Sequence, residues 1–345
     1  MFEISRRDLV LGSTGAALVF GLKGPVSFIG AAQAQKAADS LKYKVGDIEV
    51  FSLHDGSIER AVTEGMVKNA SLDDVKKALT AAGIGPDKID NPFTVTAIRT
   101  GGKVVLFDTG FGGNGPATVG KLADNMKAAG LDPAAVSTVV ISHFHPDHVS
   151  GLWVKETSAQ VFPNAEILMP EVEYKFATDP ALVEKVPEAN RPFIKRIQAT
   201  FPTWKNVKQY NDGADIAPGV KAIATPGHTA GHMSFLVASG GQQLYIQSDV
   251  TGIHQLFVRN PGWFSGFDAD GPKAEATRRA FFDRVIAEKG MIAGYHFGFP
   301  NVGTLSKDGS GSAVSAGKAR SRRCVETTEG AAFCAAPLSW DASAL

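Results

Sequence analysis

Apolar residues along the chain occur in short runs separated by glycine, proline and polar residues, which predicts an α/β protein. Apolar or alternating runs predict strands at 43–53, 93–99, 103–107, 139–141, 165–169, 220–224, 233–237, 243–247 and 291–294. Longer helix-forming stretches predict helices at 71–82, 117–129, 171–176, 181–199 and 272–289. Ser71 is the expected N-cap of the first helix, and Gly101-Gly102 is the expected turn of a hairpin.

The most informative polar segment is Ser142-His143-Phe144-His145-Pro146-Asp147-His148, which follows a predicted buried strand. In extended chain His143, His145 and Asp147 point to one side, and the proline ends the strand and redirects the chain. Three of the eight histidines lie here, so a surface loop with histidines by chance is a poor explanation. Imidazole and carboxylate without thiolate suit Zn, Mn, Fe or Co in a hydrolytic site.

Further candidate ligands lie just past three later strands, and they are His228, Asp249 and His296. Together with the four in segment 142–148 they make seven, which is enough for two adjacent ions if one carboxylate bridges them. Two other residues are expected to support these ligands. Asp108 ends a strand and can accept a hydrogen bond from a ligating histidine, although a simple Asp-x-Gly turn is the alternative. His232, four residues after His228, is expected to be structural or to contact a ligand.

Other loop residues are assigned more ordinary roles. His54-Asp55-Gly56 is expected to form a turn with a solvated His54, and Gly112–Gly115 is expected to be a flexible loop at the rim of the site. Aromatic residues in the helical segment after residue 170 and in the loops 256–267 and 297–300 are candidates for a substrate pocket, with core packing as the alternative. These pocket candidates are Phe176, Phe193, Trp263, Phe264, Phe297 and Phe299.

The two ends of the chain carry separate signals. Arg6-Arg7, an apolar stretch and Ala32-Gln33-Ala34 predict a twin-arginine leader over 1–34, hence a periplasmic or secreted protein. A membrane anchor is disfavoured because Lys23, Gly24 and Pro25 interrupt the apolar run. Residues 35–345 are then expected to form one domain.

Charge and cysteine content exclude several functions. Lys plus Arg and Asp plus Glu both number 35, so nothing favours nucleic acid or, after leader removal, a membrane surface. The only cysteines, Cys324 and Cys334, could form a disulfide in an oxidising compartment or remain free thiols. A cysteine nucleophile or a zinc–cysteine site in the core is therefore not expected.

The motifs described above resemble those of the metallo-β-lactamase superfamily over residues 43–305. The matching motifs are Asp108-Thr109-Gly110, His143-x-His145-x-Asp147-His148, Thr225-Pro226-Gly227-His228, Ser248-Asp249 and Tyr295-His296. The resemblance implies an αβ/βα sandwich with two mixed sheets flanked by helices. It also implies two divalent ions, most simply zinc, held in two ligand groups. One group is His143, His145 and His228, the other is Asp147, His148 and His296, and Asp249 bridges the two.

Within the superfamily the chain looks most similar to exported methyl parathion hydrolases and their lactonase-like relatives. The resemblance implies a hydroxide shared by two ions, Asp147 and Asp249 as catalytic residues, a small apolar phosphotriester, ester or lactone as substrate, and a possible homodimer. Acyl-homoserine lactones are the alternative substrate, although the tyrosine that such lactonases carry three residues after the bridging aspartate is Gly252 here. An insertion over about 312–336 is the second departure from these relatives.

Three further readings of the resemblance are less favoured. The common dizinc β-lactamases carry a cysteine at the position of Asp249, and thioester hydrolases of this fold carry a helical C-terminal domain that this sequence does not match. A scaffold that binds without catalysis would have no reason to keep all seven ligands.

Overall fold

The computed structural model describes residues 39–308, 311–316, 325–326 and 332–333. Its first sheet has seven strands in the order β1-β2-β3-β4-β5-β6-β7. These strands are β1 (Ser40–Val45), β2 (Ile48–Ala61), β3 (Lys88–Thr100), β4 (Lys103–Phe107), β5 (Val136–Val140), β6 (Glu166–Pro170) and β7 (Val207–Tyr210). The pairings from β1 to β4 are antiparallel and those from β4 to β7 are parallel, so the sheet is mixed.

The second sheet also has seven strands, in the order β14-β13-β12-β11-β10-β9-β8. They are β8 (Asp215–Ala217), β9 (Val220–Ala224), β10 (Met233–Ser239), β11 (Gln242–Ser248), β12 (Met291–Gly294), β13 (Val302–Asp308) and β14 (Gly311–Ala316). Only the β11–β12 pairing is parallel. A separate two-stranded ribbon consists of β15 (Val325–Glu326) and β16 (Ala332–Phe333).

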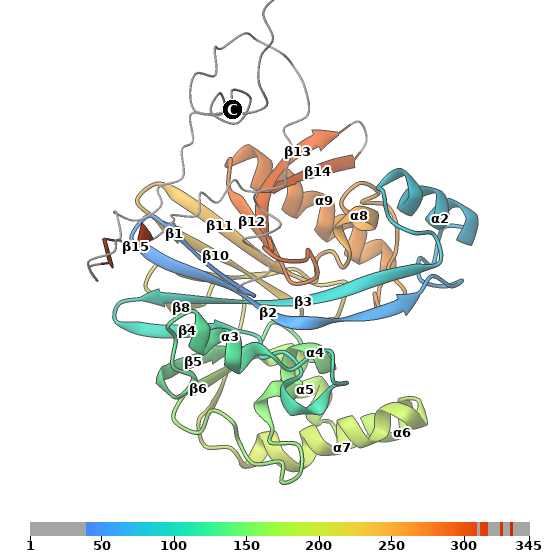
Figure 1. The fold of residues 1–345 in the computed structure, drawn as a ribbon. Helices are drawn as coiled ribbons and strands as arrows, with labels where there is room; N and C mark the ends of the chain where they lie inside the picture. Colours follow the sequence, from blue (N-terminus) through green and yellow to red (C-terminus); the bar gives the residue numbers. More distant parts are fainter. Residues whose placement is uncertain (1–38, 309–310, 317–324, 327–331, 334–345) are drawn as a thin grey trace, which may run out of the picture. The chain divides into compact units, whose positions relative to one another are not determined.

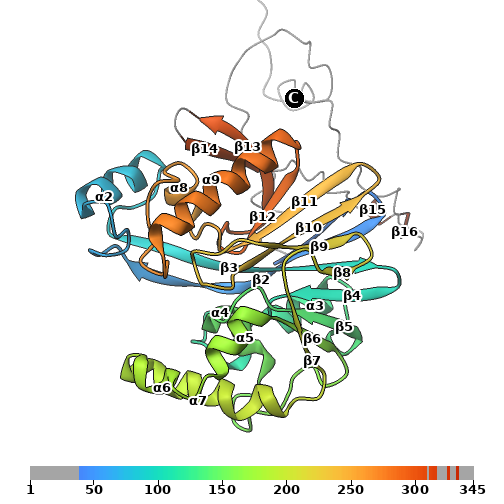
Figure 2. The same cartoon turned by 180° about the vertical axis from the view of Figure 1, so that it is seen from behind.

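Helices lie on the outer faces of both sheets (Figure 1). The described helices are α2 (Leu72–Ala81), α3 (Leu122–Ala128), α4 (Pro146–Val149), α5 (Glu171–Thr178), α6 (Leu182–Lys185), α7 (Arg191–Thr200), α8 (His254–Phe257) and α9 (Gly271–Ala287). Helices α3, α4, α5 and α7 lie beside the first sheet, whereas α8 and α9 lie beside the second, as the view from behind also shows (Figure 2). None of the helices in this described part combines the length and apolar character needed to cross a membrane.

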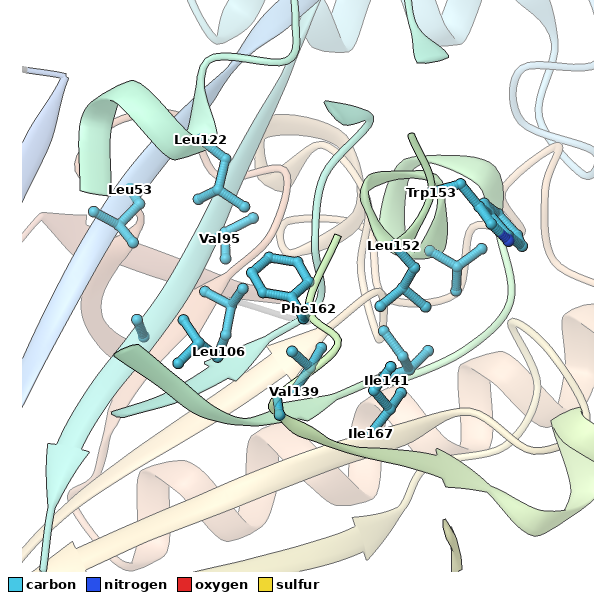
Figure 3. Close-up of a cluster of buried hydrophobic side chains, with 14 of the residues drawn as sticks. Leu53, Val95, Leu106, Leu122, Val139, Ile141, Leu152, Trp153, Phe162 and Ile167 are labelled. Atoms are coloured by element: carbon cyan, nitrogen blue, oxygen red, sulfur yellow. The ribbon is translucent and has the colours of Figure 1, made fainter. Parts of the chain in front are cut away.

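Three of the four apolar clusters in the described residues hold these layers together, and the fourth lies between α2 and α8. Residues such as Val50, Val105 and Phe235 fill the space between the two sheets. A second cluster packs the first sheet against its helices, and Figure 3 shows part of it, including Leu106, Ile141 and Trp153. A third packs α9 onto the second sheet. Burial of apolar surface on both faces of each sheet explains why the strands read as short continuous apolar runs. The αβ/βα sandwich is confirmed.

Several predicted elements are confirmed closely. Ser71 caps α2 by accepting a hydrogen bond from the backbone of Asp74, and Gly101-Gly102 connects β3 to β4. The predicted opening strand over 43–53 is wrong as a single strand, because the chain reverses at Gly46-Asp47 between β1 and β2. The predicted turn at 54–56 is also wrong, since these residues continue β2 through a bulge in its pairing with β3.

Other boundaries also differ from expectation. The predicted helix at 117–129 is reduced to α3, the segment 181–199 divides into α6 and α7, and the predicted loop 256–267 begins within α8. Strands β7, β8, β13 and β14 and the ribbon of β15 and β16 were not predicted at all. The segment expected to be an inserted loop begins as β14, which pairs with β13, and most of the remainder of that segment lies outside the described residues. The predicted leader and both cysteines lie outside the described residues.

Candidate metal centre

All seven predicted ligands meet at one edge of the sandwich, where strands of both sheets end. Those from the first sheet follow β5, and those from the second follow β9, β11 and β12. Their nitrogen and oxygen atoms form two groups, each with members within 4.8 Å of one another. The groups are His143, His145 and His228, and Asp147, His148, Asp249 and His296. This division matches the one that the sequence resemblance implies.

The first group brings three imidazole nitrogens together. His145 Nδ1 lies 3.0 Å from His143 Nε2 and 3.0 Å from His228 Nε2. Burial lowers the pKa of His145 to about 3, with the neighbouring His228 as the next cause. Burial likewise holds the pKa of His143 well below its usual value. Neutral imidazoles with converging lone pairs are the form in which histidine binds a metal ion.

The second group places two histidines against two carboxylates. His148 Nε2 lies 3.4 Å from Asp147 Oδ2 and 3.4 Å from Asp249 Oδ1. His296 Nε2 lies 3.5 Å from Asp147 Oδ2 and 3.1 Å from Asp249 Oδ2. Burial opposes a charge on His148, but the adjacent carboxylates raise its pKa well above the usual value. An environment that favours a cation on a buried imidazole also favours a bound metal cation.

Asp249 lies between the two groups. Its Oδ2 atom is 3.5 Å from His228 Nε2 in one group and 3.1 Å from His296 Nε2 in the other. Its Oδ1 atom and His148 Nε2 are both buried and have no hydrogen-bond partner within the described chain, although they face each other. Buried polar atoms normally have partners, and a divalent cation would satisfy both of these. The residues present therefore fit two divalent ions, with the Asp249 carboxylate within reach of both ligand groups.

Three of the candidate ligand histidines have their second ring nitrogen fixed by an acceptor. His148 Nδ1 donates to Asp108 Oδ2 over 2.8 Å, and His296 Nδ1 donates to the carbonyl of Pro92 over 2.9 Å. His228 Nδ1 donates to Asp268 Oδ1 over 3.0 Å. Because these acceptors cannot donate, each imidazole carries its proton on Nδ1 and directs the Nε2 lone pair at the ligand group.

Asp108 connects three strand ends beneath the ligands. Besides His148, its carboxylate accepts hydrogen bonds from the backbone and hydroxyl of Ser142, at 2.7 and 2.8 Å, and from the hydroxyl of Ser248 at 3.1 Å. Asp108 and Ser248 both have positive φ, at 66° and 52°, a backbone conformation that is strained for these residues. The structure thus places Asp108 as the sequence predicts, under the ligand loop and bonded to a histidine.

His232 holds the backbone of the shared aspartate. Its Nε2 accepts a hydrogen bond from the Asp249 backbone N–H over 3.0 Å, and its Nδ1 lies 2.8 Å from Thr225 Oγ1. With both nitrogens engaged, His232 supports the site without a lone pair directed at the ligands.

Gly227, directly before His228, shapes the turn that carries this candidate ligand. It has φ of 134°, and a Cβ there would lie 2.4 Å from the Ala274 backbone of α9. Only glycine fits at this position in the Pro-Gly-His turn.

Sequence reasoning missed three buried carboxyl groups that position the site. Glu173 accepts hydrogen bonds from the backbone of Phe144 at 3.1 Å and of Gly231 at 2.7 Å, and so ties the two histidine loops together. Asp268 binds His228 as described above. The Asp55 carboxylate accepts hydrogen bonds from the backbone N–H groups of Phe111 and Leu122, both at 3.0 Å. It thereby anchors the chain that leaves β4.

The signals for these carboxylates are weak in the sequence. Glu173 and Asp268 lie in segments that resemble ordinary polar surface, and their partners are 29 to 58 residues away in the chain. Gly110, the glycine of the Asp-Thr-Gly motif, packs directly against the Asp55 carboxylate. It has φ of 65°, and a Cβ there would lie 2.5 Å from the Asp55 carboxylate, so the glycine of the Asp-Thr-Gly motif makes room for that carboxylate.

The six aromatic pocket candidates are not placed alike. Phe297 is buried in the cluster under α9, and Phe193 and Trp263 pack against the edges of other apolar clusters. Phe176 is 60% exposed on α5. Phe264 packs on Gly271, and Phe299 lies 6.1 Å from the ring of His54, which is half-buried in β2 rather than in a solvated turn. The pocket assignment stays a prediction.

A two-sheet sandwich that gathers imidazole and carboxylate groups at one edge, with one aspartate shared between them, is the architecture of a binuclear metal protein. The chain belongs to the metallo-beta-lactamase superfamily, whose family model matches residues 92–286, more than half of the 345 residues.

Curated relatives resemble the part of the chain that carries the ligands. The N-acyl homoserine lactonase AttM of Rhizobium johnstonii is 34% identical over 122 residues, which are 33% of this chain and 40% of the relative. An N-acyl homoserine lactonase of a Bacillus species is 27% identical over 153 residues, 44% of this chain and 52% of the relative. The chain therefore matches about half or less of the length of these relatives.

Solved structures cover more of the fold. AidC, described as a dizinc quorum-quenching lactonase in complex with a product, has a TM-score of 0.74 at 23% identity, covering 82% of this chain and 99% of its own. The hydrolase AbOPH of the beta lactamase superfamily has a TM-score of 0.72 at 27% identity, covering 80% and 96%. At 23% identity the first likeness is one of fold alone.

Proposed function

We propose that the protein is a metal-dependent hydrolase that opens the ring of N-acyl homoserine lactones. The observation that carries the hydrolase assignment is the pair of ligand groups that share Asp249. The substrate class is supported by the curated relatives, which are named as lactonases of this kind and match the ligand-bearing region. This reverses the preference of the sequence analysis, which put phosphotriesters first.

We further propose that the cofactor is two zinc ions, because the ligands are imidazole and carboxylate and the structural neighbour AidC is described as dizinc. His143, His145 and His228 would hold one ion, His148, His296 and Asp147 would hold the other, and Asp249 would contact both. When bound, such ions polarise a carbonyl oxygen and lower the pKa of water toward neutrality.

Asp147 is the group of the site best placed to move a proton. Its side chain is 17% exposed, whereas that of Asp249 is 6% exposed. Burial would raise the pKa of Asp147, but the neighbouring His148 overrides this effect and the pKa falls to about 2. The ionised carboxylate can therefore accept the proton of the attacking water as the new carbon–oxygen bond forms. It can then deliver that proton to the ring oxygen as the carbon–oxygen bond of the lactone breaks.

The chain also differs from the expected lactonase pattern in a way that bears on the substrate. Gly252 stands three residues after Asp249, where the sequence resemblance leads us to expect a tyrosine in acyl-homoserine lactonases. A glycine offers no hydroxyl to the substrate carbonyl. We therefore expect activity on homoserine lactones that relies on Asp249, Asp147 and their supporting residues, with small aryl esters as the next best substrates.

The test is turnover by the purified protein on a panel of substrates, with bound metal counted in the same sample. The panel consists of N-hexanoyl homoserine lactone, a dimethyl aryl phosphotriester, an aryl ester and a β-lactam. We expect two metal ions per chain and the highest kcat/KM for the lactone. Asp283→Asn, which changes an exposed carboxylate of α9, is the matched control and should retain full activity.

Two outcomes would contradict this proposal in different ways. A phosphotriester rate well above the lactone rate would reject the substrate class and restore the first preference of the sequence analysis. A protein that binds no divalent metal under any loading condition would reject the hydrolase assignment itself.

A further inference from the structure

Helix α9 contributes a fully buried arginine to the region behind the ligands. Arg278 is 1% exposed. Its guanidinium donates to the carbonyl of Val250 over 2.9 Å, and to those of Pro261 and Trp263, each over 2.8 Å. Val250 directly follows the shared Asp249. One side chain therefore connects the loop that carries this aspartate with the segment 261–268.

The same guanidinium faces a buried carboxylate. Arg278 Nη2 lies 3.4 Å from Asp268 Oδ2, and that oxygen also accepts a hydrogen bond from the Ser265 backbone over 2.9 Å. The other oxygen, Oδ1, accepts from His228 Nδ1 over 3.0 Å. Asp268 is 2% exposed, and donors on both sides of its carboxylate fix its orientation.

The loop that carries Asp268 is held from its other side by the segment after β2. The Lys68 backbone donates to the carbonyl of Phe264 over 2.8 Å, and the Gly266 backbone donates to that of Met66 over 2.9 Å. The Lys68 ammonium donates to the Asp268 carbonyl over 2.6 Å. None of these residues belongs to the ligand motifs, yet together they fix the acceptor of one ligand.

We propose that Asp268 and Arg278 are positioning residues that hold His228 in the tautomer whose Nε2 lone pair faces His143 and His145. The carboxylate can only accept, so the His228 proton stays on Nδ1, and the guanidinium holds the carboxylate in place. This inference rests on the proposed metal centre but is independent of the substrate.

The sharpest test is Asp268→Asn, which keeps the shape of the side chain. Ser265 N–H and the Arg278 guanidinium are both donors, so the amide oxygen must face them and the amide NH₂ must face His228 Nδ1. His228 then carries its proton on Nε2, where it obstructs metal binding. We expect one of the two ions to bind about 10- to 100-fold more weakly in competition with a chelator, while the other is retained.

The metal-free variant supplies the readout that separates positioning from structural support. Its thermal unfolding should remain cooperative at a lower temperature than that of the metal-free parent, because the amide keeps the shape of the side chain but not the charge that faces the buried Arg278 guanidinium. Asp283→Asn is the control and should change neither measurement. Equal affinity of variant and parent for both ions would overturn the inference, as would a metal-free variant that does not fold.

Arg278 is tested by a comparison of adjacent arginines on α9. Arg278→Met should weaken the binding of the same ion, because it releases Asp268 and the Val250 loop together. Arg279→Met removes an arginine whose side chain is 47% exposed and paired with Glu275, and should leave metal affinity unchanged. Equal effects of the two changes would reject the role of Arg278. Failure of the parent itself to bind metal would instead reject the proposed function.

Discussion

Tyr295 donates a hydrogen bond from its hydroxyl to the backbone carbonyl of Asp147 over 2.6 Å, and so connects the end of β12 with the loop after β5. Its ring also lies against that of His148, with centroids 4.0 Å apart and an angle of 31° between the planes. Tyr295 directly precedes His296, a candidate ligand from the second sheet. It therefore supports two candidate ligands that follow the first sheet, Asp147 and His148. The tyrosine of the Tyr295-His296 motif positions the second ligand group.

Tyr295→Phe should weaken that group selectively. The change removes one buried hydrogen bond while keeping the ring, and we expect a loss of about 1 kcal/mol in the free energy of unfolding. Metal analysis after dialysis against a weak chelator should show loss of one ion before the other. Tyr245→Phe, which removes a hydroxyl paired with Glu288 on the far side of the second sheet, is the control. Equal metal loss from both variants would contradict the prediction.

Asp249→Ala should remove both ions and the activity together. Its carboxylate faces members of both ligand groups, so each group loses a ligand and the charge that offsets the cation. We expect kcat/KM to fall by at least about 1000-fold, a loss of about 4 kcal/mol in transition-state stabilisation. Metal content by mass spectrometry and lactone turnover check this. A variant with two ions and parental turnover would show that Asp249 is not the bridging ligand.

Glu173→Gln should destabilise the fold near the site. Both carboxylate oxygens accept backbone N–H groups, from Phe144 and Gly231, and a glutamine would direct its NH₂ at one of them. A buried N–H without an acceptor costs about 1–3 kcal/mol, and urea unfolding should report a loss of that size. Glu171→Gln on the same helix changes only exposed contacts with Lys175 and Asn211 and should have little effect. Similar losses in both variants would contradict the proposed role of Glu173.

Asp55 should make stability depend on pH in the weakly acidic range. Burial raises its pKa to about 6, although three backbone N–H groups oppose the shift. The folded protein thus keeps this proton between pH 4 and 6, where the unfolded chain has lost it. Stability from this group is greatest at low pH and declines as the pH rises to about 6, by about 2 kcal/mol from pH 4.5 upward.

The measurement is urea unfolding of metal-free protein at pH 4.5 and pH 7, for the parent and for Asp55→Asn. The change in unfolding free energy from pH 4.5 to pH 7 should be about 2 kcal/mol more positive in the variant, because the variant lacks the carboxyl that loses its proton over this range. Other titrating groups are common to both proteins and cancel in the comparison. Parallel changes in parent and variant would show that Asp55 titrates near its usual pKa.

The ligand positions could be predicted because the chemistry is concentrated in short segments at strand ends. Four ligands lie within 143–148, and each of the other three lies two to four residues past the end of an apolar run. Asp268 could not be predicted as the partner of His228, because the two are 40 residues apart and only the packing of α9 brings them together. Glu173 was missed for the same reason, since a helical glutamate resembles any exposed one.

Aromatic residues were harder to assign to the core or to a substrate pocket, because an aromatic side chain in a loop can be either buried or exposed. Phe297 and Phe267 both lie in loops beside the site, yet Phe297 is 8% exposed in the core and Phe267 is 60% exposed beside Arg60. Nothing in the local sequence separates them. The hairpin of β1 and β2 was missed because Gly46-Asp47 lies within a pattern that otherwise alternates as one strand does.

Each ligand group draws members from both halves of the sandwich. His143 and His145 come from the first sheet and His228 from the second, while Asp147 and His148 face Asp249 and His296 across the same boundary. A chain with only one half formed would offer at most two ligands to either ion. Two bound ions would therefore crosslink the two halves of the sandwich, and each ion would find its full set of ligands only after both halves had formed.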